Sequence, residues 1–505
     1  MQKTKLQLSA IALSLSFLCA QPVVAKIPVI GSALSCLLRL HQKWESHRLN
    51  QKLLRPSQHI PFDTKFHVEG KTVTYEQAIR RYAKLILTTG INLKPGMNII
   101  LFGLPEHFMG QGGEKSFAAI LCEEAYSMGA KYIYFNSMIK DAEWARIEKS
   151  DVQHLGYMPK FQDGIFAEIG SSKEEWARIS LGTQPIMPDM PGLSAAEQGA
   201  RASTVSKPMS QSIQQLFDRA DRHEMPWIVV VVPTFEYAQR FLADTTDTPL
   251  VKFYKTWQIY IELLGLHLED PSAFWEKLSV KARQRSKRLN ELSPSELHFT
   301  TPDGKTDLTV AIVQECGWSA AADNYTLGGR PFMANIPSYE IFTSPHRMKV
   351  NGRMQVSKPV IVNGKSVEGL WFEFKDGEVV SFDATKNREV IQAIFDKEPS
   401  FKRAGEIALV SRDSPINKFG RLFLNILFDE NAAIHLALGS AYPLKLAHLE
   451  TPAEREAAGL NESNQHVDFM FGTPDMRVEA TTNDGRTLLL MDKGQFTNEI
   501  DGGGH

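Results

Sequence analysis

The chain has 505 residues, of which 43% are hydrophobic and 23% are charged, a balance that excludes a disordered, collagenous or polytopic membrane protein. At about 100–200 residues per domain, this length predicts two or three domains. The 56 Lys and Arg residues nearly balance the 58 Asp and Glu residues, with no long run of like charge, so no nucleic acid is expected as a partner.

Residues 1–25 have the pattern of a cleaved signal peptide. Lys3 and Lys5 precede an apolar run from Leu8 to Ala20, and the small residues of Val23-Val24-Ala25 follow. The run is short for a bilayer core of about 30 Å, and no later segment approaches about 20 apolar residues. We expect an exported protein, periplasmic or secreted, without a stable membrane span after cleavage. An uncleaved membrane anchor is the alternative.

Residues 26–60 form an N-terminal extension with a possible amphipathic helix from Leu37 to Leu49, which would act as a linker or a dimer contact. Three cysteines remain after signal cleavage, at positions 36, 122 and 316. This odd, widely spaced set predicts neither a disulfide framework nor a zinc ribbon.

Periodic segments predict an N-terminal α/β domain with a parallel sheet over residues 61–292. Ile79, Tyr82, Ala83 and Ile86 have helical spacing. Further along, two apolar strands enclose a helix and indicate a right-handed βαβ unit. The segments are residues 98–102, 116–128 and 131–135.

The rest of this domain is expected to hold a long surface excursion over residues 182–210, a strand over 227–232 and helices between 235 and 292. The excursion is predicted because its many Pro, Ser, Gly and Met residues lack periodicity. The Ser293-Pro294 turn marks the predicted domain boundary.

Residues 293–500 predict an α+β domain rich in antiparallel strands. Dipeptides that suit tight turns with positive φ stand between β-rich runs. They are Asp303-Gly304, Asn351-Gly352, Asn363-Gly364, Asp376-Gly377 and Asp484-Gly485. A helix is predicted to interrupt this domain at Asp429 to Gly439.

Several catalytic signatures are missing. The glycine-rich loop at Gly110 to Lys115 fits neither the P-loop nor the G-x-G-x-x-G spacing, so a nucleotide-binding protein lacks its phosphate loop. No G-x-S-x-G elbow occurs, and His223-Glu224 does not continue as H-E-x-x-H. A serine hydrolase and a zincin therefore find no support.

The tract from Asp429 to Asp468 is rich in metal-ligand side chains. His466 and Asp468 are two apart in an alternating run, which places both on one face of a strand. Glu430, His435 and Tyr442 precede them. A hydrogen-bonded surface pair is the alternative for His466 and Asp468, and a helix N-cap is the preferred role of Asp429. His346 is either a cleft residue or an ordinary loop histidine.

Five motifs resemble those of the thermophilic metalloaminopeptidases, the aminopeptidase T, II and S enzymes, in the same order and at similar spacing. The motifs are residues 335–343, 405–410, 428–433, 435–439 with Tyr442, and 466–470. Weaker likeness extends over about residues 65–495. Ser338 and Tyr339 depart from the family's usual Thr and Gly before Glu340, and family members generally lack an export signal.

The resemblance implies an N-terminal α/β domain, a C-terminal catalytic domain, a homodimer and two divalent metal ions per active site, with zinc, cobalt or manganese as candidates. It implies a metallopeptidase that removes N-terminal residues from peptides, with Tyr442 as a catalytic side chain. The implied metal ligands are Glu340, Glu406, His435, His466 and Asp468, with Glu430 as a further ligand or a close neighbour.

The residue types suit such chemistry. Two cations about 3.5–4 Å apart need several anionic oxygens to offset their repulsion, and imidazoles to fill the remaining positions. Tyr442 would hydrogen-bond the oxyanion, and Glu340 or Glu430 would carry a proton to the leaving amine. The alternative is a catalytically impaired member, an exported protein that binds peptides or metal without cleaving them.

Overall fold

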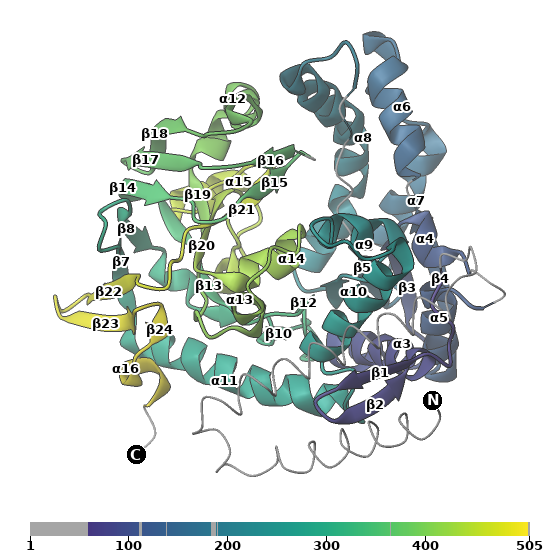
Figure 1. Ribbon diagram of the computed structural model, residues 1–505. Coiled ribbons are helices and arrows are strands. Elements are labelled where there is room, and N and C mark those ends of the chain that lie inside the picture. The colour runs from purple at the N-terminus through teal and green to yellow at the C-terminus, as the bar shows by residue number, and fades with distance from the viewer. Residues whose placement is uncertain are drawn as a thin grey trace.

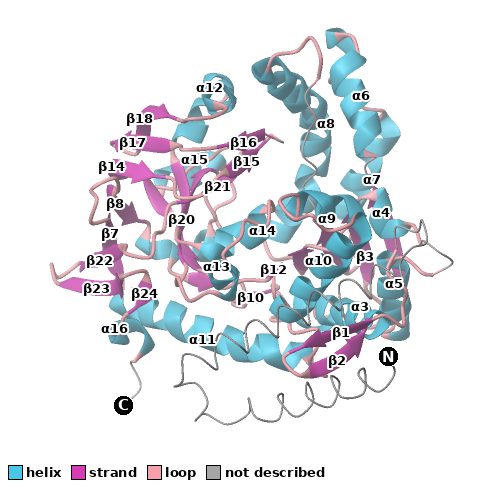
Figure 2. Cartoon of the chain, in the orientation of Figure 1, coloured by secondary structure: helices cyan, strands magenta, loops and turns pink. Residues whose placement is uncertain are grey.

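The computed structural model describes residues 59–502 except 111–113, 138, 183–187, 189 and 364. The predicted signal peptide, the helix at Leu37 to Leu49 and the middle of the glycine-rich loop at Gly110 to Lys115 lie outside these residues. Figure 1 shows an N-terminal lobe and a C-terminal lobe joined along their lower part by the long helix α11 (Pro271–Leu292). Figure 2 shows that helices dominate the first lobe and strands the second.

A five-stranded parallel sheet forms the centre of the N-terminal lobe, in the order β12-β6-β5-β3-β4. The predicted βαβ unit is confirmed, because β3 and β4 pair in parallel with helix α5 between them. The strands are β3 (Asn98–Gly103), β4 (Tyr132–Ser137), β5 (Trp176–Leu181), β6 (Trp227–Val230) and β12 (Asn335–Ile336). A two-stranded hairpin, β1 (Lys65–Val68) and β2 (Lys71–Thr74), precedes the sheet.

Helices cover both faces of this sheet, because alternate strand residues are apolar on each side. Ile99 and Leu101 pack with helices α3, α5 and α10, whereas Ile100 packs with α7 and α8. The helices are α3 (Tyr75–Leu85), α4 (Pro105–Phe108), α5 (Phe117–Ser127), α6 (Lys140–Lys149), α7 (Lys160–Ser171), α8 (Ala195–Asp221), α9 (Phe235–Phe241) and α10 (Pro249–Leu263).

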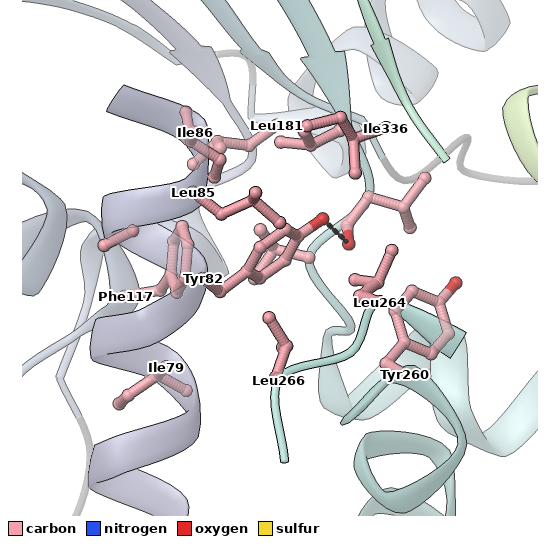
Figure 3. Close-up of a cluster of buried hydrophobic side chains, with 14 of the residues drawn as sticks. Ile79, Tyr82, Leu85, Ile86, Phe117, Leu181, Tyr260, Leu264, Leu266 and Ile336 are labelled. Atoms are coloured by element: carbon pink, nitrogen blue, oxygen red, sulfur yellow. Dashed lines mark hydrogen bonds between the residues drawn. The ribbon is translucent and has the colours of Figure 1, made fainter. Parts of the chain in front are cut away.

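Helix α3 shows how the sequence builds this core. Thr74 and Gln77 form a capping box at its start, and the predicted apolar stripe is buried. Its Tyr82 donates a hydrogen bond of 2.9 Å to the carbonyl of Val231, which satisfies the hydroxyl inside the apolar cluster of Figure 3.

The predicted surface excursion over residues 182–210 is wrong in its second half. Helix α8 begins after Ser194, whose side chain forms a capping box with Glu197. The early part of the helix carries Ala, Gly, Ser and Thr in place of large apolar residues, so hydrophobic periodicity does not reveal it. Packing against α7 supplies the stabilisation that local pattern lacks.

Two antiparallel sheets form the C-terminal lobe and enclose its core, which confirms the predicted fold class. The larger has the order β18-β17-β14-β8-β7-β22-β23-β24 and the smaller the order β21-β20-β19-β13-β9. Phe299, Met354 and Phe372 of the larger sheet belong to one apolar cluster with Leu436 and Phe469 of the smaller. The eight strands of the larger sheet are β7 (Pro294–Thr300), β8 (Asp307–Ile312), β14 (Pro345–Gln355), β17 (Trp371–Lys375), β18 (Glu378–Asp383), β22 (Arg477–Thr482), β23 (Thr487–Asp492) and β24 (Gln495–Phe496).

The smaller sheet contains β9 (Ser319–Ala320), β13 (Ile341–Thr343), β19 (Ala404–Leu409), β20 (His435–Gly439) and β21 (His466–Met470). Two short hairpins also follow helix α11 in the chain: β10 (Asn324–Tyr325) with β11 (Pro331–Phe332), which contacts His223 and Trp227 of the N-terminal lobe, and β15 (Val360–Val362) with β16 (Lys365–Val367). The helices of this lobe are α12 (Arg388–Lys397), α13 (Pro415–Phe419), α14 (Ile426–Asp429), α15 (Pro452–Ala457) and α16 (Asn498–Asp501).

Four of the five predicted turns join paired strands, as expected. The exception is Asn351-Gly352, which lies inside strand β14. Gly352 has φ +106°, and a Cβ there would lie 2.1 Å from the carbonyl oxygen of Asp307 on the neighbouring strand β8. The glycine therefore serves a close approach of two strands and not a turn.

Strand β12 links the lobes, because it comes from beyond the Ser293-Pro294 turn yet pairs with β6 of the N-terminal sheet. Helix α11 does end at that turn, where Ser293 has φ +44°. The boundaries of the four predicted segments remain predictions. In the part of the chain that the structure describes, no helix has the length and apolar character needed to cross a membrane.

Candidate metal centre

One face of the smaller sheet in the C-terminal lobe carries the polar side chains of the centre. Across three strands, Glu406 stands opposite Ala437, and Ala437 opposite Asp468. Residues that pair directly share a face, so both carboxylates project beside the small methyl group of Ala437. His435 and His466 lie two residues from Ala437 and Asp468, and therefore on the same face. The opposite face holds Leu436, Leu438 and Phe469 in the core.

His435 is on strand β20, so the helix predicted for Asp429 to Gly439 is wrong. Only its first residues are helical, in the end of α14 and a short 3₁₀ turn over Glu430–Ala432. Strand β20 is buried along its whole length and pairs on both sides. Such a central strand is apolar on both faces, so it lacks the alternation that identifies half-buried strands.

The two histidines are ion-paired with carboxylates. Nε2 of His435 lies 3.2 Å from Oε2 of Glu340, and Nε2 of His466 lies 3.1 Å from Oε2 of Glu406. Asp468 completes the second group, with Oδ1 at 3.4 Å from Nε2 of His466. The strand prediction for His466 and Asp468 is confirmed, and the pair lines a pocket, with His466 half-buried and Asp468 buried, unlike the surface pair that was the alternative.

Backbone carbonyls orient both rings. Nδ1 of His466 lies 2.8 Å from the carbonyl oxygen of Ser440, and Nδ1 of His435 lies 3.2 Å from that of Ala433. An Nδ1–H that donates to a carbonyl leaves Nε2 directed at the carboxylates. This is the arrangement by which proteins orient a histidine that binds a metal through Nε2.

Burial and mutual repulsion perturb the charges of the centre. Burial raises the pKa of Glu406 and, well above its usual range, that of Glu430, and the other carboxylates add to both shifts. Burial alone would lower the pKa of His435, but the hydrogen bond to Glu340 and the surrounding negative charges outweigh it and raise this pKa to about 9. An excess of buried carboxylates over cations is thus the main electrostatic feature.

Glu340 enters the centre from the loop before β13. The backbone N–H of Tyr339 donates a hydrogen bond of 2.6 Å to Oδ1 of Asn431, which ties this loop to the segment that carries Glu430. The ring of Tyr339 packs 5.6 Å from that of Trp275, centroid to centroid, and is not part of the pocket wall. The departure at Ser338 and Tyr339 therefore leaves the carboxylate of Glu340 in the centre.

Asp429 belongs to neither candidate ligand group, and its side chain caps no helix, so its predicted N-cap role is wrong. Its carboxylate accepts hydrogen bonds from the backbone N–H groups of Phe423 (2.6 Å) and Asn425 (3.0 Å). Burial is the main cause that raises its pKa to about 7. The residue supports the loop before α14 and so holds Glu430 in place.

A cavity of about 100 Å³ brings the whole predicted set together. Its lining includes all seven candidate residues, Glu340, Glu406, Glu430, His435, Tyr442, His466 and Asp468. Tyr442 is 37% exposed, and its ring lies 4.9 Å from that of His466, centroid to centroid. Their assignment as ligands and catalytic groups stays a prediction, whereas their convergence is a property of the structure.

The donor atoms fit divalent metal ions. Glu340, Glu406 and His435 each offer one ligand atom within 4.8 Å of the others, and so do Glu406, His466 and Asp468. Oδ1 of Asp468 is buried and, among the described residues, accepts no hydrogen bond, although Nε2 of His466 lies 3.4 Å away as an ion-pair partner. A buried carboxylate oxygen with so weak a partner is costly, and a cation would stabilise it.

Sequence reasoning missed several residues of this pocket. The N-terminal lobe contributes His223 and Trp227, and Phe342 packs 5.8 Å from the ring of Tyr442, centroid to centroid. Asn431 positions the loop of Glu340. No spacing in the sequence marks the missed residues, because strand pairing and lobe contact bring them together.

His346 is not in the wall of this pocket; its Nδ1 accepts a hydrogen bond from the backbone N–H of Met348.

Comparison with known proteins gives consistent matches over most of the chain. The model of the thermophilic metalloprotease (M29) family matches residues 75–496. Aminopeptidase T from Thermus aquaticus is 30% identical over 427 residues, which are 84% of this chain and 99% of that protein. Aminopeptidase 2 from Geobacillus stearothermophilus is 27% identical over 428 residues, with the same two shares.

The fold agrees with a solved structure as well. Wild-type AmpT from Thermus thermophilus superposes with a TM-score of 0.72 at 27% sequence identity, covering 84% of this chain and 100% of that one. The family resemblance expected from the five motifs is therefore confirmed.

Proposed function

The chain belongs to the thermophilic metalloprotease (M29) family and is a metal-dependent aminopeptidase; from this premise we propose that it works with two divalent metal ions per active site and is exported. The two-metal proposal rests on the position of Glu406. It belongs to both three-residue ligand groups, one with Glu340 and His435, the other with His466 and Asp468. A carboxylate has two oxygens and can bridge adjacent cations.

The residues of the centre would divide the work. Metal ions held there would acidify a water molecule and polarise the carbonyl of the first peptide bond. Tyr442, at the rim, would donate a hydrogen bond to the oxygen that becomes negative. Glu430 belongs to neither ligand group and has a raised pKa, so it suits the transfer of a proton to the leaving amine. The buried carboxylates also attract the α-ammonium of a peptide.

The alternative of a catalytically impaired member rested on Ser338 and Tyr339. Since Tyr339 packs on Trp275 while Glu340 still reaches the pocket, no observation favours that alternative.

The metal ligands can be tested by His466→Ala and Glu406→Ala. We expect both variants to lose bound metal and to hydrolyse aminoacyl-anilides at least about 100-fold more slowly, because each removes a ligand of the centre. His298→Ala is the matched control, since it breaks another His–carboxylate pair, that with Asp307, at the surface of the larger sheet. Metal analysis measures the bound ions, and kinetics measures the hydrolysis rate. Unchanged metal content in both site variants would refute the assignment.

Export and assembly need separate tests. The relatives are matched over 99% of their length but over only 84% of this chain, and the family model begins at residue 75. We propose that residues 1–25 are cleaved and that the mature chain is a homodimer. N-terminal sequencing of the protein from the periplasm or medium should begin at Lys26, and light scattering should give twice the mass of one chain.

A further inference from the structure

A second, much larger cavity lies between the two lobes. It has a volume of about 960 Å³ and is lined by α6, α7 and α8 of the N-terminal lobe and by α12 of the C-terminal lobe. The hairpin of β15 and β16 lies in the same region of the view, between α12 and α8 (Figure 1). Asn464, Gln465 and His466 also line the cavity. His466 therefore belongs to the walls of both this cavity and the carboxylate-rich pocket.

The walls suit an extended peptide. Helix α8 presents Gly199, Ala202, Ser203 and Ser206, which recur at the spacing of one helix face and let a backbone approach closely. Amide side chains that can bond peptide groups stand nearby, on Gln162 and Asn464.

Helix α12 supplies the opposite wall. One face of this helix lines the cavity, with Val390, Ala393, Ile394 and Lys397 at helical spacing. The face is apolar at the first three positions and carries an ammonium group at the fourth. Nζ of Lys397 donates a hydrogen bond of 3.3 Å to the carbonyl of Ala200 on α8. This bond joins two lining residues of the cavity, one from each lobe.

Lys397 lacks an anionic partner. Among the residues that the structure describes, no carboxylate lies within ion-pair distance of its ammonium, and partial burial lowers its pKa. Several other charges of the wall have partners: Lys140 contacts Glu106 and Glu236, Arg146 lies 3.8 Å from Glu143, and Glu398 accepts hydrogen bonds from the Ser463 hydroxyl and the backbone N–H of Asn464. An anion from outside the chain would complement Lys397.

The charges of the two cavities suit the two ends of a peptide. The small pocket holds buried carboxylates, which attract an α-ammonium, whereas the wall of the large cavity carries the ammonium of Lys397 and the cavity has room for several residues. We propose that the large cavity binds the part of a peptide beyond its first peptide bond, with the α-carboxylate on Lys397. This inference rests on the aminopeptidase function and adds to it a preference for short peptides with a free carboxyl end.

The proposal can be tested with peptides of two to five residues, each supplied as the free acid and as the C-terminal amide. An aminoacyl-anilide serves as the substrate without a peptide carboxylate. For at least one length, the metal-loaded enzyme should prefer the acid by roughly fivefold in kcat/KM, through KM, as a partly exposed ion pair provides. Lys397→Gln should abolish this preference and leave the anilide rate unchanged, and Lys397→Arg should retain it. Lys375→Gln, which removes an exposed charge outside the cavity, is the control.

A purely structural role of Lys397 would lower the rates on all substrates together, and that result overturns the proposal. So does equal use of acid and amide at every length. If no substrate is cleaved at all, the aminopeptidase function is refuted. Peptide binding, measured without cleavage, then still tests whether Lys397 holds a carboxylate. N-acetylated peptides, measured by calorimetry, should bind about fivefold more tightly as acids than as amides, and only with Lys397 or Arg at position 397.

Discussion

Tyr442 stands at the rim of the centre with its ring against His466. Tyr442→Phe keeps this ring contact and removes only the hydroxyl group. We expect kcat to fall about 10²–10³-fold, the effect of losing one oxyanion donor, while KM and metal content stay the same. Tyr325→Phe, an exposed tyrosine outside the pocket, is the control. Steady-state kinetics check the prediction, and an unchanged kcat would show that another group stabilises the oxyanion.

His435 makes metal binding depend on pH. Its pKa of about 9 in the metal-free chain means that the ring is protonated at neutral pH, and a proton on Nε2 must leave before this nitrogen binds a metal. We therefore expect metal affinity to increase by about tenfold or more per pH unit from 7 to 9, with proton release, because the carboxylates around His466 also raise the pKa of that ring well above its ordinary value.

The stability of the metal-free chain should show the opposite trend. The pKa of His435 is raised on folding, so its ion pair stabilises the metal-free fold fully below the ordinary pKa of about 6.5 and no longer above about 9. Competition titrations measure the affinity, and the pH change in weak buffer measures the protons released on metal binding, with His298→Ala as control. An affinity that is flat between pH 7 and 9 would contradict the assignment of His435 as a ligand.

At the scale of the element, strand β20 depends on Gly439. This residue pairs with His466 of β21 and has φ +108°, and a Cβ there would lie 2.0 Å from the carbonyl oxygen of Gln465. Gly439→Ala must push apart the two strands that carry His435, His466 and Asp468. We expect the free energy of unfolding to fall by about 2–4 kcal/mol, and metal binding to weaken as well.

The control for Gly439→Ala is Gly164→Ala in helix α7, where an added Cβ meets no atom within 4 Å. That variant should not lose stability, because alanine has the higher helix propensity. Chemical denaturation and metal titration measure the two effects. A Gly439→Ala protein with normal metal affinity would mean that the strand spacing at His466 is not critical.

At the scale of the molecule, the metal should stabilise the fold. Four buried carboxylates, Glu340, Glu406, Glu430 and Asp468, face one another in the cavity, and cations would remove their repulsion. At a free metal concentration 1,000 times Kd, binding adds about 4 kcal/mol, so a chelator should lower Tm by several degrees. Calorimetry with and without added metal measures this shift, and an unchanged Tm would argue against a tightly bound ion.

The sequence alone determined the main outline of both lobes. Strong local patterns identified helix α3, the βαβ unit and the hairpins, because capping residues, apolar spacing and turn dipeptides act over a few residues. The strand position of His466 and Asp468 followed from the same alternation. The rest of the candidate set, above all Glu340 and Glu406, was implied by the family resemblance and not by spacing.

Only the tertiary structure decided how these residues meet. Glu340 and Asp468 are far apart in sequence and share a cavity because β13, β19, β20 and β21 pair in one sheet. It also decided that His435 lies on a strand, that residues from Ala195 onward form helix α8, and that Gly352 fits a close strand contact. In each case the stabilising contacts are distant in sequence, so no local pattern encodes them.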